Sequence, residues 1–140
     1  MTRTEISKLR LLAVPAWANV VVVIYAILMA AGGVVAMVKP ELLVGPHAQI
    51  NDAVRTYAGY LTARNLTLAV MLLVLLVMGA RRALGNLVAA LGLIQLVDCC
   101  VDCAEARWTV APGVLVLGIL LLVAAARLSG SAFWRRSAWS

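Results

Sequence analysis

Charged side chains are scarce in this chain of 140 residues: 13% are Asp, Glu, Lys or Arg, whereas 64% are hydrophobic. Soluble globular domains are roughly 45 to 50% apolar and about 25% charged. The composition therefore excludes a soluble domain and predicts an integral membrane protein. Because a bilayer crossing takes about 20 residues, the length allows a single membrane domain, residues 1–140, with about four spans.

The motifs of several common enzyme classes are also missing. There is no G-x-S-x-G, no P-loop, no H-E-x-x-H and no serine within the long apolar stretches. Serine hydrolysis, nucleotide chemistry and zinc proteolysis therefore have no support. Three cysteines with a single histidine do not suit a zinc site, and no motif calls for a cofactor. The net charge of +6 follows from the membrane topology, so nucleic acid is not expected as a partner.

What the sequence does have is four long apolar stretches, which predict an all-α fold, an integral membrane four-helix bundle. The helices are expected at about residues 17–37, 53–78, 84–104 and 110–126. Asn51 or Asp52 is a suitable N-cap for the second of them.

Basic residues are unevenly divided between the two ends of these helices. One side would have Arg3, Lys8, Arg10, Arg81, Arg82, Arg127, Arg135 and Arg136. The other side would have only Lys39, Arg55 and Arg107. The positive-inside rule then places both termini in the cytoplasm and predicts a multi-pass protein of a bacterial-type inner (plasma) membrane.

Polar residues within the second and third helices are the candidate functional site. Tyr57, Tyr60 and Arg64 share one stripe of the second helix. On the third helix, four polar residues fall within roughly 80° of one another: Gln95, Asp98, Asp102 and Glu105. The two helices are antiparallel neighbours, so a contact between Arg64 and Asp98 is geometrically feasible. An ionisable residue within a span is by default a hypothesis of function.

The polar stripes predict an outward-opening pocket that binds a small hydrophobic molecule taken from membrane lipid. Acid/base conversion is a second possibility, as in a hydrolase, cyclase or isomerase that opens an epoxide or shifts a double bond. Asp98 is then the base or nucleophile positioner, and Arg64 is its charge partner. The donors to developing oxyanion charge are Tyr57, Tyr60 and Asp102. Tyr57 is also expected to bind the ligand, together with four other residues: Asn65, Gln95, Glu105 and His47.

Two other interpretations stay open. Arg64 and Asp98 can form a structural pair that fixes helix register in a non-catalytic scaffold or partner subunit. The protein can also be a small proton-coupled transporter, although the inner half of the bundle offers only Asn19 and Asn86. Asn65 lies about 100° off the stripe of Arg64 and also suits a contact with the first or last helix.

The cysteines of the third helix, Cys99, Cys100 and Cys103, include a C-x-x-C spacing that allows a redox interpretation. They lie on the same side of the helix as a seam of small residues: Gly85, Ala89 and Gly92. Such seams occur where membrane helices pack closely, so packing is favoured over redox chemistry. The last helix has no polar residue between positions 110 and 126, which predicts contact with lipid or with a second copy in a homo-oligomer.

Three segments carry a resemblance to a known group: residues 60–68 with Arg64 and Asn65, the basic turn at 79–85, and Leu96-Val97-Asp98. They resemble small four-helix membrane proteins of bacteria and fungi, the DoxX-like group and related families of unknown function. The resemblance covers roughly residues 57–126. It implies a compact bundle in which Arg64 and Asp98 face the interior. DoxX proteins proper are linked to quinone-dependent sulfur oxidation, for which this sequence has no distinct motif, and the emopamil-binding-like fold is similar only in layout.

Overall fold

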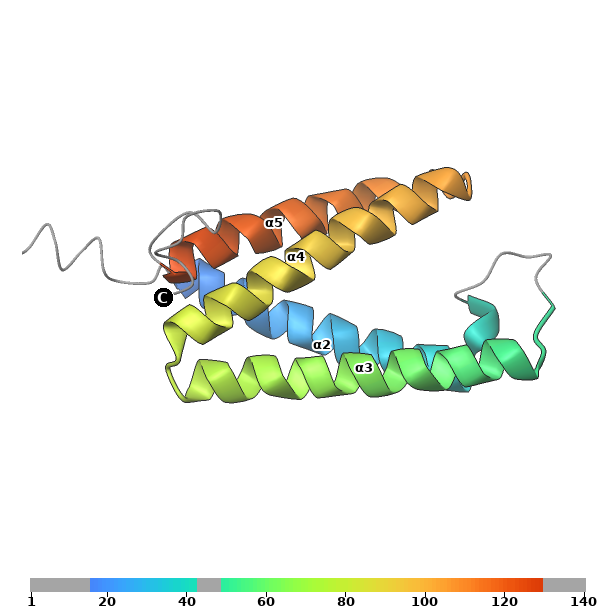
Figure 1. Cartoon of the computed structure of the whole chain (residues 1–140), viewed down its shortest axis with the longest axis horizontal. Coiled ribbons are helices and arrows are strands. Elements are labelled where there is room, and N and C mark those ends of the chain that lie inside the picture. The colour runs from blue at the N-terminus through green and yellow to red at the C-terminus, as the bar shows by residue number, and fades with distance from the viewer. Residues whose placement is uncertain (1–15, 43–48, 130–140) are drawn as a thin grey trace, which may run out of the picture. The chain divides into compact units, whose positions relative to one another are not determined.

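The computed structural model describes residues 16–42 and 49–129, and within these ranges the chain is helical with no strand (Figure 1). The α-helices are α2 (Ala16–Val38), α3 (Asp52–Val77), α4 (Arg81–Ala104) and α5 (Ala111–Ser129). A short 3-10 helix, η1 (Pro40–Leu42), follows α2. The predicted all-α class with four helices is therefore confirmed for the described residues.

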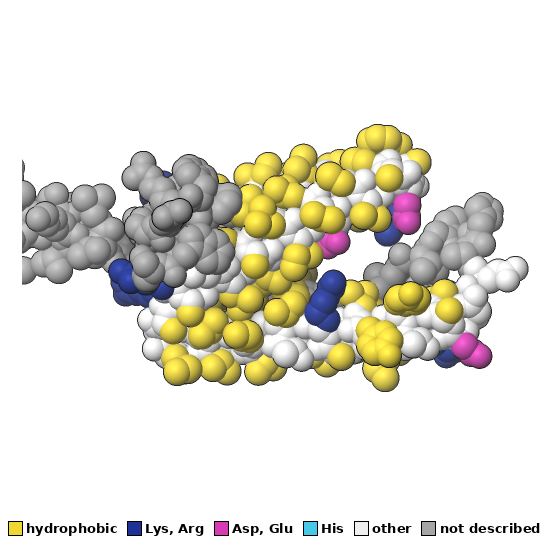
Figure 2. Space-filling view, viewed as in Figure 1, with side chains coloured by type: hydrophobic (Ala, Val, Ile, Leu, Met, Phe, Trp, Pro, Cys, Tyr) yellow, Lys and Arg dark blue, Asp and Glu magenta, His cyan; other side chains and the backbone are white. Residues whose placement is uncertain are grey.

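All four α-helices are long and apolar enough to cross a bilayer. The shortest, α5, has 19 residues, which is about 28 Å at 1.5 Å per residue. Hydrophobic side chains cover much of the visible helix surface (Figure 2). Large ones remain exposed, such as Ile27 at 60% and Val77 at 87%. Surfaces of this kind suit lipid rather than water, and the chain is a multi-pass membrane protein.

The chain divides into two compact units. One unit is residues 23–74, which contains most of α2, η1 and most of α3. The other contains the start of α2 up to Val22 together with residues 75–129 of the described chain, and so holds α4 and α5. The prediction that residues 1–140 form one membrane domain stays a prediction.

In the second unit α4 and α5 run antiparallel and side by side (Figure 1). A Cβ atom on Gly92 would lie 2.9 Å from Cγ of Leu122 and 3.2 Å from the carbonyl oxygen of Gly118. A side chain at this position would require Leu122 to move and would press on the Gly118 backbone, so glycine favours the close approach of the two helices. Gly85 and Ala89 are also buried on this side of α4, so the predicted close packing of the small-residue seam is confirmed.

One face of α5 is buried, with Gly118, Leu121 and Ala125 among its members. The glycine and alanine residues of this face let α5 pack on α4 within the chain. The opposite face of α5 remains exposed at residues such as Val116 and Ile119, so the predicted contact with lipid or a second copy stays a prediction for that face. The predicted homo-oligomer stays a prediction.

In the unit of residues 23–74, α2 and α3 meet at Gly33 and Thr62. The Thr62 hydroxyl lies 2.6 Å from the Gly33 carbonyl oxygen, to which it donates, and 2.8 Å from the carbonyl oxygen of Ala58. Thr62 is only 6% exposed, so this is a buried hydrogen bond between helices. A Cβ on Gly33 would lie 3.5 Å from Cβ of Asn65, which shows that Asn65 faces α2, one of the placements that the sequence allowed.

The helix starts follow from local chemistry. The side-chain oxygen of Asn51 accepts a hydrogen bond of 3.0 Å from the backbone N–H of Val54, so Asn51 is confirmed as the N-cap of α3. The next helix, α4, begins at Arg81, three residues before the predicted start, and the connection that follows α3 is correspondingly shorter than predicted. Arg81 and Arg82 therefore lie in the first turn of α4 rather than in a loop.

The ends of α3 and α4 share one geometry. The N–H of Ala80 donates to the carbonyl of Leu75, and the N–H of Arg107 donates to the carbonyl of Asp102 at 2.8 Å. In each case the residue before the donor has a left-handed backbone: Gly79 at φ 67° and Ala106 at φ 57°. This arrangement is the Schellman motif, in which the left-handed residue is usually glycine. Ala106 adopts it despite its Cβ, and the turn brings Arg107 back over the end of α4.

Candidate functional site

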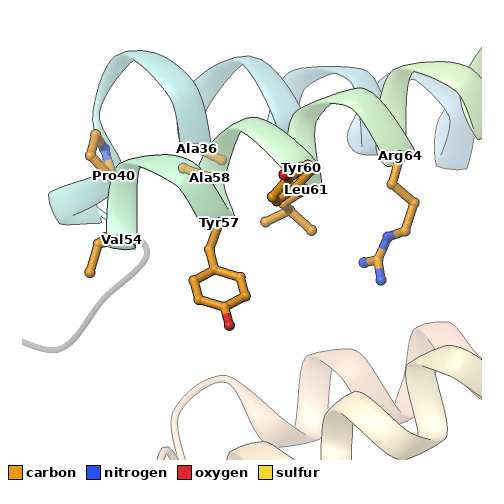
Figure 3. A pocket seen from close by; sticks show the side chains of 8 residues that line it. All are labelled: Ala36, Pro40, Val54, Tyr57, Ala58, Tyr60, Leu61 and Arg64. Atoms are coloured by element: carbon orange, nitrogen blue, oxygen red, sulfur yellow. The ribbon is translucent and has the colours of Figure 1, made fainter. Parts of the chain in front are cut away.

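A cavity of about 550 Å³ lies in the unit of residues 23–74, within the size range of small-molecule pockets (Figure 3). Its walls come from the end of α2, from η1 and from the first four turns of α3. The lining residues are Ala36, Pro40, Val54, Tyr57, Ala58, Tyr60, Leu61 and Arg64. Those on α3 recur every three or four positions, which places them on one face of the helix.

Three of the predicted site residues line this cavity together. Tyr57 is 75% exposed, Tyr60 is 70% exposed, and Arg64 is also exposed. Figure 3 shows the side chains of Tyr57 and Arg64 leaving the same side of α3, with Leu61 between them. Two phenols and one guanidinium are thus presented beside an otherwise apolar wall.

Arg64 lies near the middle of its span. It is about 18 Å along α3 from Asp52 and about 20 Å from Val77, at 1.5 Å per residue. A cation at this depth costs roughly 2.5 to 3.5 kcal/mol on insertion scales unless a partner compensates it. Within the described residues of its own unit, no carboxylate forms an ion pair with Arg64. The guanidinium is therefore available in that unit to an anion or to a hydrogen-bond acceptor.

The predicted site residues of α4 belong to the other unit. Asp98 and Glu105 are exposed, whereas Asp102 is buried. Gln95 is half-buried against α5, because a Cβ on Gly118 would lie 3.2 Å from Cβ of Gln95. The assignment of these four residues to a ligand site stays a prediction. The loop residue His47 lies outside the described residues.

Asp102 has a partner that the sequence did not indicate. Its carboxylate lies 3.2 Å from a guanidinium nitrogen of Arg107, and the side chains of Asp102 and Arg107 are 10% and 39% exposed. The two residues are five positions apart, beyond the usual helical spacing for ion pairs. The left-handed Ala106 closes that distance by turning the chain back. The pair links the last turn of α4 to the residue that follows the left-handed turn.

The cysteines of α4 all carry free thiols. The Cys99 thiol lies 3.5 Å from the carbonyl oxygen of Ala111, at the start of α5, and donates to it. Cys99 therefore takes part in the contact between α4 and α5, in agreement with the packing interpretation. Cys100, which the sequence also placed on the packed side, is exposed, so for this cysteine the packing prediction is wrong.

The cavity includes residues that sequence reasoning missed. Val54, Ala58 and Leu61 are apolar and give no chemical signal, although their spacing from Tyr57 matches one helical face. Pro40 joins them only because η1 folds beside α3, which is a tertiary effect. The sequence therefore singled out the polar residues that line this cavity but not the apolar ones, and their role in binding stays a prediction.

The sequence was compared with known protein families, and one family matches most of the chain. Residues 26–128 match the family described as a domain of unknown function, DUF4267. The chain belongs to this family. The DUF4267 match spans both the cavity and the Asp102–Arg107 pair. The family match does not test the resemblance to the DoxX-like group, which stays a prediction. Neither the comparison with curated proteins nor the comparison with solved structures gave a match.

Proposed function

We propose that this DUF4267 protein binds a small amphipathic molecule from the bilayer in the cavity of the 23–74 unit. The observation that carries the proposal is a guanidinium and two phenols at the wall of an otherwise apolar cavity of about 550 Å³. The apolar part of the molecule would pack on side chains such as Leu61. Its polar end, an anion or a hydrogen-bond acceptor, would meet Arg64.

The chemistry of the wall favours such a ligand. A guanidinium has five N–H donors and no acceptor, so it binds carboxylates and other acceptors strongly. Tyr57 and Tyr60 combine an apolar ring with a hydroxyl, which suits a ligand with an apolar body and a polar end. An anion beside Arg64 would also offset the cost of a cation near the middle of the span.

The proposed orientation puts the cavity near the outer surface of an inner (plasma) membrane. Both termini and the turn between α3 and α4 would be cytoplasmic, because the basic residues of the sequence are concentrated on that side. The end of the cavity formed by Pro40 and Val54 would then lie near the outer interface, where a molecule from the outer leaflet can enter.

Acid/base conversion of the bound molecule, with Asp98 as the base, is a further prediction from the sequence alone. Asp102 already has a partner in Arg107, which favours a stabilising role for it over a role as oxyanion donor. The scaffold and transporter interpretations also remain predictions.

The test is native mass spectrometry of the full-length protein in mild detergent. Wild type should retain a small molecule of defined mass. Arg64→Gln should reduce its occupancy by roughly tenfold to a hundredfold, the loss expected for one hydrogen bond to a charged group. Tyr57→Phe should reduce it less, since one neutral donor is removed. Arg55→Gln is the matched control, because Arg55 is exposed on α3 and does not line the cavity.

Two outcomes contradict the proposal. One is a wild-type protein that carries only bulk lipid. The other is an Arg64→Gln variant that keeps its helical circular dichroism and still retains the same mass. If Arg64→Gln instead loses its cooperative thermal transition while Arg64→Lys keeps it, the cation has a structural role, as in the scaffold interpretation.

A further inference from the structure

The polar side chains of the cavity wall are spread along α3 rather than gathered at one end. Tyr57 and Arg64 are seven residues apart, which is about 10 Å along the helix axis at 1.5 Å per residue. Seven residues bring the helix back to nearly the same angle, so both side chains leave the same side of α3, with Leu61 between them (Figure 3). The wall therefore has a polar group at each end and an apolar section between them.

Both polar groups lack a partner among the described residues of the 23–74 unit. No carboxylate there forms an ion pair with Arg64, and the Tyr57 hydroxyl has no hydrogen bond there. Tyr57 is 75% exposed, and Arg64 is also exposed. A guanidinium has five N–H donors, and a phenol has one O–H donor. A ligand that offers oxygen acceptors at two points of the wall would satisfy both side chains.

The depth of Arg64 disfavours a lipid with a single head group. The 26 residues of α3 span about 39 Å, which exceeds the hydrocarbon core of about 30 Å. Val54, two residues after the start of the helix, therefore lies at the level of the head groups. A lipid that entered beside Val54 would keep its head group there and place its hydrocarbon chain against Arg64. The guanidinium would still lack an acceptor, so the ligand needs a polar group at its inner end.

The charge of the wall indicates what that inner group is. Arg64 is the one charged residue that lines the cavity. A carboxylate carries a single negative charge, so it neutralises one guanidinium and forms two parallel hydrogen bonds with it. A phosphate monoester carries a charge of about −1.5 to −2 at pH 7 and would leave a surplus of negative charge near the middle of the span. The wall therefore suits a carboxylate.

We propose that the ligand of this cavity is an elongated, single-chain carboxylate with a second oxygen group at its far end. This inference rests on the proposed function and specifies its ligand. The carboxylate pairs with Arg64 near the middle of the span, and the chain packs on Leu61. The second oxygen group bonds to the Tyr57 hydroxyl, closer to the membrane surface. Because a phenol both donates and accepts, that group is a hydroxyl, a ketone or an ester.

The test measures binding to the full-length protein in detergent by scintillation proximity. Radiolabelled ω-hydroxyoctanoate is the probe, since its extended chain carries oxygen at both ends. Its unlabelled competitors are octanoate, which lacks the outer hydroxyl, and the α,ω-diol of octane, which lacks the carboxylate. For the wild type, unlabelled ω-hydroxyoctanoate should compete about fivefold better than octanoate, as expected for one neutral hydrogen bond. It should compete roughly tenfold to a hundredfold better than the diol, as expected for hydrogen bonds to a charged group.

Two substitutions identify which end of the probe meets which residue. Tyr57→Phe should abolish the preference for ω-hydroxyoctanoate over octanoate, and Arg64→Gln should abolish the preference over the diol. If circular dichroism shows that Arg64→Gln does not fold, Arg64→Lys should still reduce the preference over the diol, because an ammonium lacks the two-point geometry. Arg55→Gln is the control. It changes an exposed cation of α3 that does not line the cavity and should leave both preferences unchanged.

Three results would overturn the inference. The first is equal competition by ω-hydroxyoctanoate and octanoate in the wild type, or a folded Tyr57→Phe variant that keeps the full preference between them. The second is a folded Arg64→Gln variant that still prefers the carboxylate over the diol. The third is a wild type that binds none of the three probes. The proposed function is decided separately, by the mass that co-purifies with the wild type, so the two failures are distinguishable.

Discussion

Replacing Gly92 with leucine should lower the free energy of unfolding by about 3 kcal/mol, because α4 and α5 can then no longer pack at a point of close approach. Even the first carbon of a side chain at this position would lie 2.9 Å from Cγ of Leu122 and 3.2 Å from the carbonyl oxygen of Gly118. A leucine adds three more carbons there. The helices must separate, and the contacts between them are lost.

Gly113 provides the matched control for this substitution. It lies on α5, and a Cβ there would meet nothing within 4 Å. Gly113→Leu should leave stability unchanged or raise it slightly, since leucine is the better helix former by somewhat less than about 1 kcal/mol. Equilibrium unfolding in detergent micelles measures both variants. Equal losses would show that α4 and α5 do not depend on the close approach at Gly92.

Removing Arg107 should cost more stability than neutralising Asp102, although the two residues form one ion pair. Arg107→Ala leaves a carboxylate whose side chain is only 10% exposed without its cation, and we expect a loss of about 2 to 3 kcal/mol. Asp102→Asn leaves a guanidinium that is 39% exposed and can reach water, so a loss of about 1 kcal/mol is expected.

Unfolding of both single variants and of the double variant tests this asymmetry. The double variant should be no less stable than Arg107→Ala, since it no longer buries an unpaired charge. Glu105→Gln serves as the control, because Glu105 is an exposed acid at the same helix end. Equal effects of the two single substitutions, or an effect of Glu105→Gln as large as that of Arg107→Ala, would contradict the expected role of the pair.

Features that depend on one helix were predictable from the sequence. The apolar length of each stretch indicated four helices, and residue type alone narrowed the cap of the second helix to Asn51 or Asp52, of which the structure shows Asn51. The small residues from Gly85 to Gly92 indicated a close helix contact, which the structure provides with α5. In each case the residues that carry the signal lie within one segment of the sequence.

Features that depend on the path of the chain between helices were not predictable. The Asp102–Arg107 pair requires a left-handed turn at Ala106, and alanine gives no sign of that conformation. The face of α5 that packs on α4 was not predicted, because a helix without polar residues has no pattern that separates a packed face from a lipid-facing one. The apolar half of the cavity needs Pro40 to fold beside α3, which local patterns do not report.

The central claim is that the cavity of the 23–74 unit holds a lipophilic molecule. The most direct test is to fill the cavity with a larger side chain while leaving the charge of its wall unchanged. Ala58→Trp places a large ring on the cavity wall, whereas Ala63→Trp makes the same change at an exposed position of α3 that does not line it. Native mass spectrometry should find the bound mass lost from folded Ala58→Trp and retained by Ala63→Trp. Equal retention by both folded variants would contradict the account, because the molecule would then be bound elsewhere.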